Sequence, residues 1–101
     1  MRKLFISQPM AGKTHAQILA EREAALEMAH KLFGDFELID SVFDLDAQSK
    51  NVGLHYLGRS LTLMAEADIV MFCPGWENAR GCKIEHDCAL AYGVGFICDK
   101  W

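Results

Sequence analysis

Ile69-Val70-Met71-Phe72-Cys73 is the most continuous apolar run in the chain, and the turn-forming pair Pro74-Gly75 follows it directly. A run of this kind, in which polar residues do not alternate with apolar ones, is typical of a strand buried on both faces. Strands buried in this way belong to parallel sheets that carry helices on both sides. We therefore predict that residues 69–73 form the central strand of an α/β domain.

Three further strands and three helices are predicted around this strand. Residues 3–7, 36–39 and 95–98 are short apolar runs bounded by turn residues, which indicates strands. Thr14 and Gln17 have the spacing of a capping box and open a predicted helix over residues 15–33, which Gly34 ends. Apolar residues at helical spacing predict two more helices, over residues 54–67 and 80–92. The side chains expected to face the core are Ile18, Ala25, Leu26, Ala29, Leu32, Leu54, Leu57, Leu61, Met64, Ile84, Cys88, Ala91 and Tyr92.

Strands and helices alternate along this sequence, which predicts one doubly wound parallel sheet of the Rossmann-like or flavodoxin-like type, with helices on both faces. We expect four strands in the spatial order 2-1-3-4. A chain of 101 residues is long enough for one core and too short for two, so residues 1–101 form a single predicted domain. Ligands bind to such sheets at the carboxyl ends of the strands, which are residues 7–13, 40–41 and 73–81 here.

Composition excludes several classes of protein. Apolar residues make up 51% of the chain and charged residues 24%, which excludes a disordered or fibrous chain. The net charge is -4 and the basic residues are scattered, so we expect no nucleic-acid partner. No stretch approaches the roughly 18 apolar residues of a membrane span, and the first residues lack the apolar core of a signal peptide, so we expect no membrane partner and a cytoplasmic location.

The four cysteines are predicted to be reduced thiols. Cys73, Cys82, Cys88 and Cys98 lie inside apolar patterns, and a cytoplasmic chain with its own core has little need of disulfides. Zinc is the alternative, but the sequence has no CxxC pair and no fourth ligand at a recognisable spacing. We therefore expect no metal site and no cofactor.

Gly12-Lys13-Thr14 matches the end of the phosphate-binding loop pattern, but Ser7 stands where that pattern needs its first glycine. A full nucleotidase also needs more chain than this one has. A loop with a glycine, a lysine and free backbone N–H groups at a helix start can still hold an anion or sugar hydroxyls. The alternative is that the loop only connects a strand to a helix.

Three residues after the central strand could also take part in binding or chemistry. Trp76 is suited either to stacking on a base or ribose, or to covering a subunit contact. Arg80 could bind a phosphate through its planar guanidinium group. A cation at a helix start opposes the helix dipole, and this cost suggests that Arg80 has a function. Glu85 could be partly desolvated and serve as a nucleophile or general base, although most helical glutamates face solvent and periodicity alone favours that case.

Four groups of residues carry a resemblance to a known family. They are Phe5-Ile6-Ser7-Gln8-Pro9-Met10 with Gly12-Lys13, Ile39-Asp40-Ser41, Ala67-Asp68-Ile69-Val70, and Gly81-Cys82-Lys83-Ile84-Glu85 with Ala89. Over almost its whole length the chain thus resembles the short branch of the nucleoside 2-deoxyribosyltransferase-like superfamily. In that family a glutamate that opens the last long helix attacks the anomeric carbon of a deoxyribose, and Glu85 falls on its position.

This resemblance implies an enzyme that acts on N-glycosidic bonds, either as a deoxyribosyltransferase or as an N-hydrolase of nucleosides or nucleotides. It makes Glu85 the expected nucleophile, which forms a glycosyl-enzyme as in retaining glycosidases. The ligand-binding residues expected beside it are Ser7, Gln8, Met10, Gly12, Lys13, Asp40, Ser41, Trp76 and Arg80.

One position departs from the family pattern. Active relatives carry an aspartate where this chain has Ser60, which cannot protonate a departing base at neutral pH. The acid could come from Asp40 or from a neighbouring subunit, since the resemblance also implies a homo-oligomer with helices 54–65 and 80–92 at its interface. The alternative is a non-catalytic module that binds a nucleotide-derived ligand for sensing or sequestration.

Overall fold

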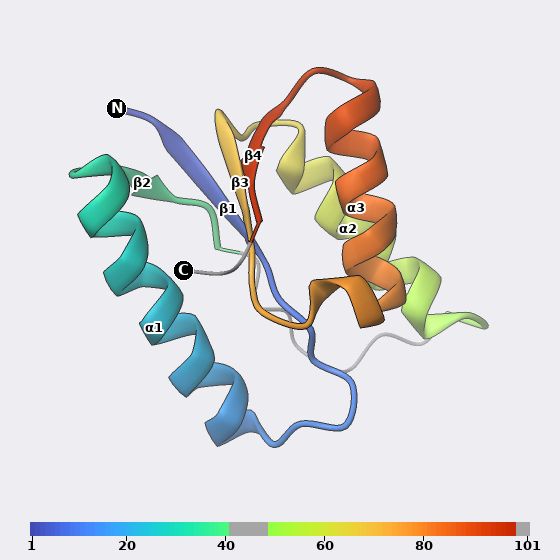
Figure 1. Ribbon diagram of the computed structural model, residues 1–101. Helices are drawn as coiled ribbons and strands as arrows, with labels where there is room; N and C mark the ends of the chain where they lie inside the picture. Colours follow the sequence, from blue (N-terminus) through green and yellow to red (C-terminus); the bar gives the residue numbers. More distant parts are fainter. Residues whose placement is uncertain (41–48, 99–101) are drawn as a thin grey trace.

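Figure 1 shows the computed structural model, which describes residues 1–40 and 49–98. The polar stretch 44–51 lacks a clear apolar period and is predicted to be a loop. Its residues 44–48, and the expected ligand-binding residue Ser41, lie outside the described residues. The elements are β1 (Lys3–Ser7), α1 (His15–Phe33), β2 (Glu37–Leu38), α2 (Val52–Met64), β3 (Ile69–Phe72), the 3₁₀ helix η1 (Trp76–Asn78), α3 (Arg80–Ala91) and β4 (Gly95–Ile97).

The four strands form one parallel sheet in the order β2-β1-β3-β4, which confirms the predicted fold class and strand order. β1 and β3 pair over four positions, from Leu4 opposite Ile69 to Ser7 opposite Phe72. The chain winds outward from this central pair in both directions. The carboxyl ends of β1 and β3 therefore flank the point where the strand order reverses, which is where such sheets bind ligands.

Alternate strand residues supply two apolar layers, one on each face of the sheet. Leu4 and Ile6 of β1 pack with Met71 of β3 against α1, while Phe5 and Phe72 point to the opposite face. Figure 1 shows α1 alone on one side of the sheet and α2 with α3 on the other. This alternation decides which helix each β1 side chain meets, because successive side chains of a strand point to opposite faces.

α1 begins and ends where the sequence predicts. Thr14 accepts a hydrogen bond from the backbone N–H of Gln17, and the Gln17 side chain accepts one from the Thr14 backbone N–H, so the capping box is complete. Gly34 ends the helix with a φ of 74°, in the region where glycine carries no steric penalty.

Several predicted core positions are exposed. Leu32, Leu54 and Tyr92 are 53%, 63% and 85% exposed, and Ile84 and Ala91 are also exposed, so these five predictions are wrong. Arg22 is buried instead, in line with Ala25 and Ala29 on the inner face of α1. The spacing of apolar residues predicts which face of a helix is apolar, but it does not predict how far a neighbouring element extends to cover that face.

The described part of the chain contains no helix that is both long enough and apolar enough to cross a membrane.

Candidate functional site

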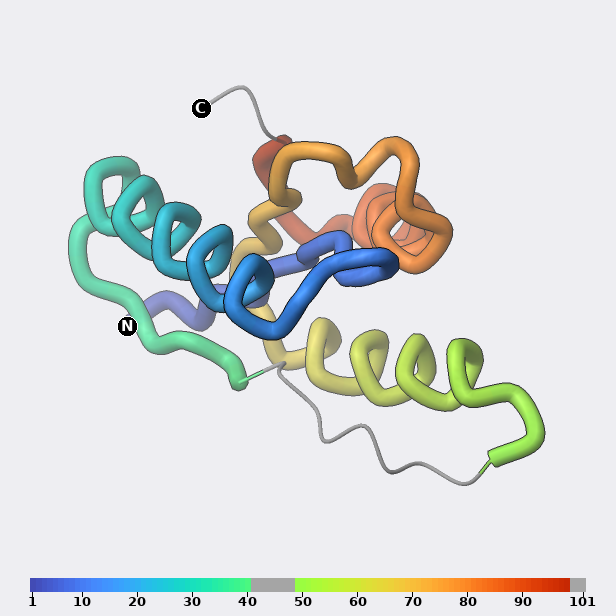
Figure 2. Tube along the Cα trace, turned by 90° about the horizontal axis from the view of Figure 1, so that it is seen from below, coloured from blue at the N-terminus to red at the C-terminus, as the bar shows by residue number. Residues whose placement is uncertain are grey.

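A cleft of about 800 Å³ opens at the carboxyl ends of β1 and β3. Its walls come from the loop after β1, from α2, and from the segment that leads into α3. Figure 2 looks at this end of the sheet, and there the loop after β1 lies beside the start of α3, with α2 across from both. The residues lining the cleft are Gln8, Pro9, Met10, Ala11, Lys13, Ile18, Asn51, Gly53, Leu54, Tyr56, Leu57, Ser60, Asn78, Ala79, Arg80, Gly81, Cys82, Ile84 and Glu85.

Glu85 is the carboxylate of this cleft, and it is only 6% exposed. It belongs to the inner stripe of α3 together with Cys82 and Ala89, which turns its side chain toward the end of β1. There the Ser7 hydroxyl donates a hydrogen bond of 2.8 Å to Glu85 Oε1. The last residue of the first strand thus holds the carboxylate of the last helix.

Burial raises the pKa of Glu85 from 4.5 to about 7, and the hydrogen bond from Ser7 opposes this rise. No described cation forms an ion pair with it, so desolvation dominates. A carboxyl group that titrates near neutral pH in a cleft is typical of a catalytic group, because both its protonated and its ionised forms are accessible.

Cys82 lies beside this pair in the same cleft. Burial raises the pKa of its thiol to about 11, and the neighbouring Glu85 charge adds to the rise while a hydrogen bond with Ser7 lowers it. Cys73, which directly follows β3, is buried too, and burial raises the pKa of its thiol to about 12. Both thiols stay protonated at neutral pH, so neither is suited to act as a thiolate nucleophile.

The start of α3 presents positive charge to the cleft. Ala79 caps the helix without a side-chain hydrogen bond, so the first backbone N–H groups have no such partner. Arg80 reaches toward the start of α2, where a Cβ on Gly53 would lie 3.7 Å from its guanidinium Nη2. That distance is an ordinary van der Waals contact, so the guanidinium group lies alongside the first turn of α2. Free amide groups and Arg80 together favour an anionic ligand group at this rim.

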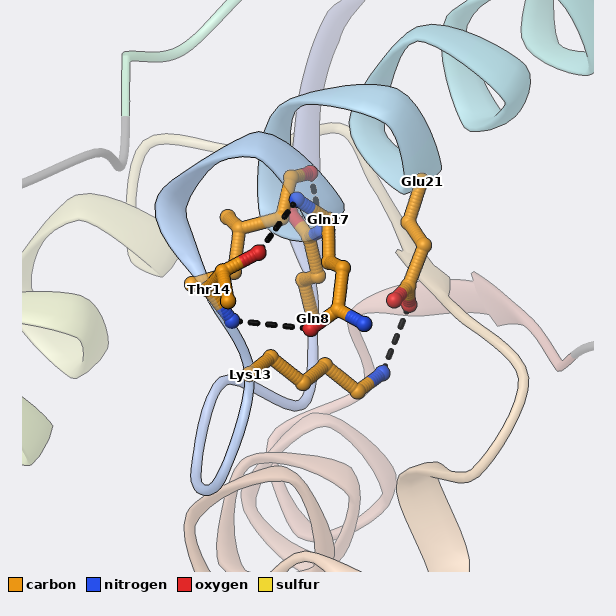
Figure 3. Close-up of polar contacts among 6 residues, drawn as sticks. Gln8, Lys13, Thr14, Gln17 and Glu21 are labelled. Atoms are coloured by element: carbon orange, nitrogen blue, oxygen red, sulfur yellow. Dashed lines mark hydrogen bonds and ion pairs between the residues drawn. The ribbon is translucent and has the colours of Figure 1, made fainter.

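Gln8 and Lys13 line the cleft from the loop after β1. Figure 3 draws the polar contacts between this loop and α1. The Gln8 side chain is 7% exposed, and its Nε2 donates a hydrogen bond of 2.6 Å to the Ile18 carbonyl oxygen. Its Oε1 is buried and has no hydrogen-bond partner among the described residues. The Lys13 ammonium group forms an ion pair of 2.6 Å with Glu21 of α1. These contacts tie the loop to the first turns of α1.

The structure brings five of the predicted site residues to the cleft wall, namely Gln8, Met10, Lys13, Arg80 and Glu85. Ser7 contributes from beneath, through its bond to Glu85. Gly12 lies in the same loop but is not part of the lining, and Ser41 lies outside the described residues.

Asp40 and Trp76 lie elsewhere. Asp40 is exposed just after β2. Burial lowers the pKa of Arg22, and the Asp40 carboxylate opposes part of that lowering. Trp76 stacks on His86 with ring centroids 4.5 Å apart, within an aromatic cluster that includes Phe72 and Phe96. Neither residue lines the cleft.

Three contributors were missed in the sequence. Tyr56 and Asn51 line the cleft from α2 and its N-cap, and Cys82 lines it from α3. Tyr56 carried a detectable signal, since it stands one helical turn before Ser60 and so shares its face. Asn51 and Cys82 carried none, because their roles depend on which elements meet.

The described residues contain no group of three or more histidine, cysteine, aspartate or glutamate side chains arranged to hold a metal ion. A second hollow of about 360 Å³, lined by His55, Gly58, Arg59, Thr62 and Leu63, offers neither a carboxylate nor a thiol.

Comparison with known proteins gives one family. The model of the family described as Domain of unknown function (DUF4406) matches residues 2–97. Neither the curated proteins nor the solved structures contain a match to the chain.

Proposed function

The chain belongs to the DUF4406 family, and we propose that it breaks or transfers the N-glycosidic bond of a nucleoside or nucleotide, with Glu85 as its nucleophile. The observation that carries this proposal is the buried Glu85 carboxyl group, held by Ser7 at the floor of the cleft. The resemblance to the nucleoside 2-deoxyribosyltransferase-like superfamily supports the same assignment.

The proposed reaction proceeds in two displacements. Ser7 occupies Oε1, so we assign the attack on the anomeric carbon to Oε2. The new C–O bond forms as the C–N bond breaks, and the electron pair of the C–N bond leaves with the base, which gains a proton. Water or a second base then attacks the anomeric carbon and displaces Glu85, giving hydrolysis or transfer with net retention.

The size and charge of the cleft support a nucleoside or nucleotide as ligand. A volume of about 800 Å³ lies within the usual range of small-molecule sites. Apolar side chains such as Met10, Leu57 and Ile84 offer surface to a base, while Arg80 and the start of α3 favour a phosphate or another anionic group.

The test is release of free base by the purified protein from a panel of nucleosides and 5′-monophosphates, measured by chromatography. We expect Glu85→Ala to lower the rate by several orders of magnitude, because the covalent route is lost, while the ligand still binds. Glu77→Ala is the control, since Glu77 is exposed in η1 and is not one of the lining residues. An undiminished rate in Glu85→Ala would overturn the mechanism.

A second candidate function is binding without turnover. Ser60 lines the cleft on α2, where the family pattern places a carboxylic acid, and this favours a sensing or sequestering role. That role predicts that a nucleotide raises the unfolding temperature of the protein although no base is ever released.

We also propose that the protein is a cytoplasmic homo-oligomer. Leu54 is 63% exposed at the cleft and Leu90 is 65% exposed on α3, so both predicted interface helices offer uncovered apolar side chains. The four cysteines are free thiols, which is the state maintained in a reducing compartment.

A further inference from the structure

Cleavage of an N-glycosidic bond leaves negative charge on the departing base unless an acid protonates it. Such an acid must face the leaving group, which departs on the side of the sugar opposite the attacking carboxylate. The donor is therefore expected on a wall of the cleft other than the one that carries Glu85.

The described lining of the cleft holds few groups that could release a proton. Arg80 keeps its proton in proteins, and the Lys13 ammonium group is bound to Glu21 at 2.6 Å. The Cys82 thiol is buried next to Glu85, on the nucleophile's own side. The aliphatic hydroxyl of Ser60 is too weak an acid for this step. Only the Tyr56 phenol remains in this set.

Tyr56 is also well placed for the task. It lies on α2, which forms the wall across from the loop after β1 and the start of α3 (Figure 2). Tyr56 and Ser60 are one turn apart on the same helix face, and both line the cleft. A phenol on the longer tyrosine side chain extends further from the helix than the Ser60 hydroxyl does.

We propose that Tyr56 is the general acid of the N-glycosidic reaction, an inference that rests on the function proposed above. As the C–N bond breaks, the Tyr56 hydroxyl donates its proton to a ring nitrogen of the departing base. The phenolate then recovers a proton from the water or the second base that attacks in the next step, so the cycle leaves the enzyme unchanged. The ligand class is accordingly a nucleoside or nucleotide whose base needs protonation to leave, such as a purine.

The test compares two substrates, one whose base must be protonated to leave and one whose base need not be. Deoxyguanosine needs a proton on its base, whereas N7-methyldeoxyguanosine already carries the positive charge that protonation would supply. Base release is measured for the wild type, Tyr56→Phe and Tyr92→Phe. The last variant is the matched control, because Tyr92 is the other tyrosine of the chain and is 85% exposed outside the cleft lining.

We expect Tyr56→Phe to slow release from deoxyguanosine by about 100-fold or more, the usual contribution of a general acid. Release from N7-methyldeoxyguanosine should change by less than about threefold, which also shows that the variant is folded. Tyr92→Phe should match the wild type on both substrates.

Four results overturn the proposal. An equal loss on both substrates means a structural role for Tyr56, and no loss on deoxyguanosine means that another group supplies the proton. If the wild type cleaves only the methylated substrate, the Glu85 chemistry stands but no acid operates. If the wild type cleaves neither substrate nor any member of the panel, the proposed function itself fails and the inference fails with it.

Discussion

Replacing Glu85 by glutamine should stabilise the protein above neutral pH. The substitution keeps the shape of the side chain and an oxygen that can accept the Ser7 hydrogen bond, but it removes the ionisation. In the native protein burial raises the pKa of Glu85 from 4.5 to about 7, so folding favours the protonated form. The native state then binds more protons than the unfolded chain between these two values.

The sign and size of the effect follow from this difference. The stability that protonated Glu85 contributes is fully present below about pH 4.5 and declines as the pH rises toward 7. Above about pH 7 this contribution is lost. The shift corresponds to about 3 kcal/mol, because each pKa unit is worth about 1.4 kcal/mol. For a domain of this size that is roughly 10 to 20 °C in the unfolding temperature.

The assay is urea unfolding of the wild type, Glu85→Gln and Glu77→Gln at pH 5 and pH 8. We expect Glu85→Gln to be close to the wild type at pH 5 and more stable by about 2 to 3 kcal/mol at pH 8. Glu77→Gln removes an exposed carboxylate and corrects for the change in net charge. If the two variants gain equally at pH 8, Glu85 is not desolvated in the folded protein, and the case for it as a tuned nucleophile is lost.

Three more outcomes are expected. Ser7→Ala removes the hydrogen bond that lowers the pKa of Glu85, so the midpoint of the pH–rate profile should move above 7 and the rate at neutral pH should fall; an unmoved midpoint would contradict the role of Ser7. Gly75→Ala should lower the free energy of unfolding in urea by about 1–2 kcal/mol, because the φ of Gly75 is 88°. Gly58→Ala, in the middle of α2 where a Cβ meets no other atom, should raise the free energy of unfolding by as much as about 1 kcal/mol. Light scattering at micromolar concentration should give a homo-oligomer, and a monomer there would count against the expected shared interface.

The sheet was predictable because its signals are local. The uninterrupted run at residues 69–73, the capping box at Thr14 and the stop at Gly34 each act over a few neighbouring residues, and each is observed in place, with β3 ending at Phe72. The strand order followed from the alternation of strands and helices, since right-handed crossovers leave few topologies. The 3₁₀ helix η1 was missed, because its three residues carry no repeat long enough to detect.

The site was predictable in position and only partly in composition. Parallel strands bring their carboxyl ends to one edge, so the loop after β1 and the start of α3 had to be neighbours. The exposure of a side chain depends on which element covers it. Helical periodicity predicted that Tyr92 packs in the core, but this side chain is 85% exposed. Periodicity also favoured a solvent-facing Glu85, but Glu85 is buried.

The sequence by itself determined the sheet, its strand order and the edge at which the cleft opens, because local apolar patterns and chain connectivity suffice for these. Only the tertiary structure decided that the Glu85 carboxyl group is desolvated against Ser7 and that Tyr56 faces the same cleft from α2. The physical reason is that desolvation and hydrogen bonding are properties of contacts between segments far apart in the chain. Ser7 and Glu85 are separated by 78 positions, and no local pattern encodes their meeting.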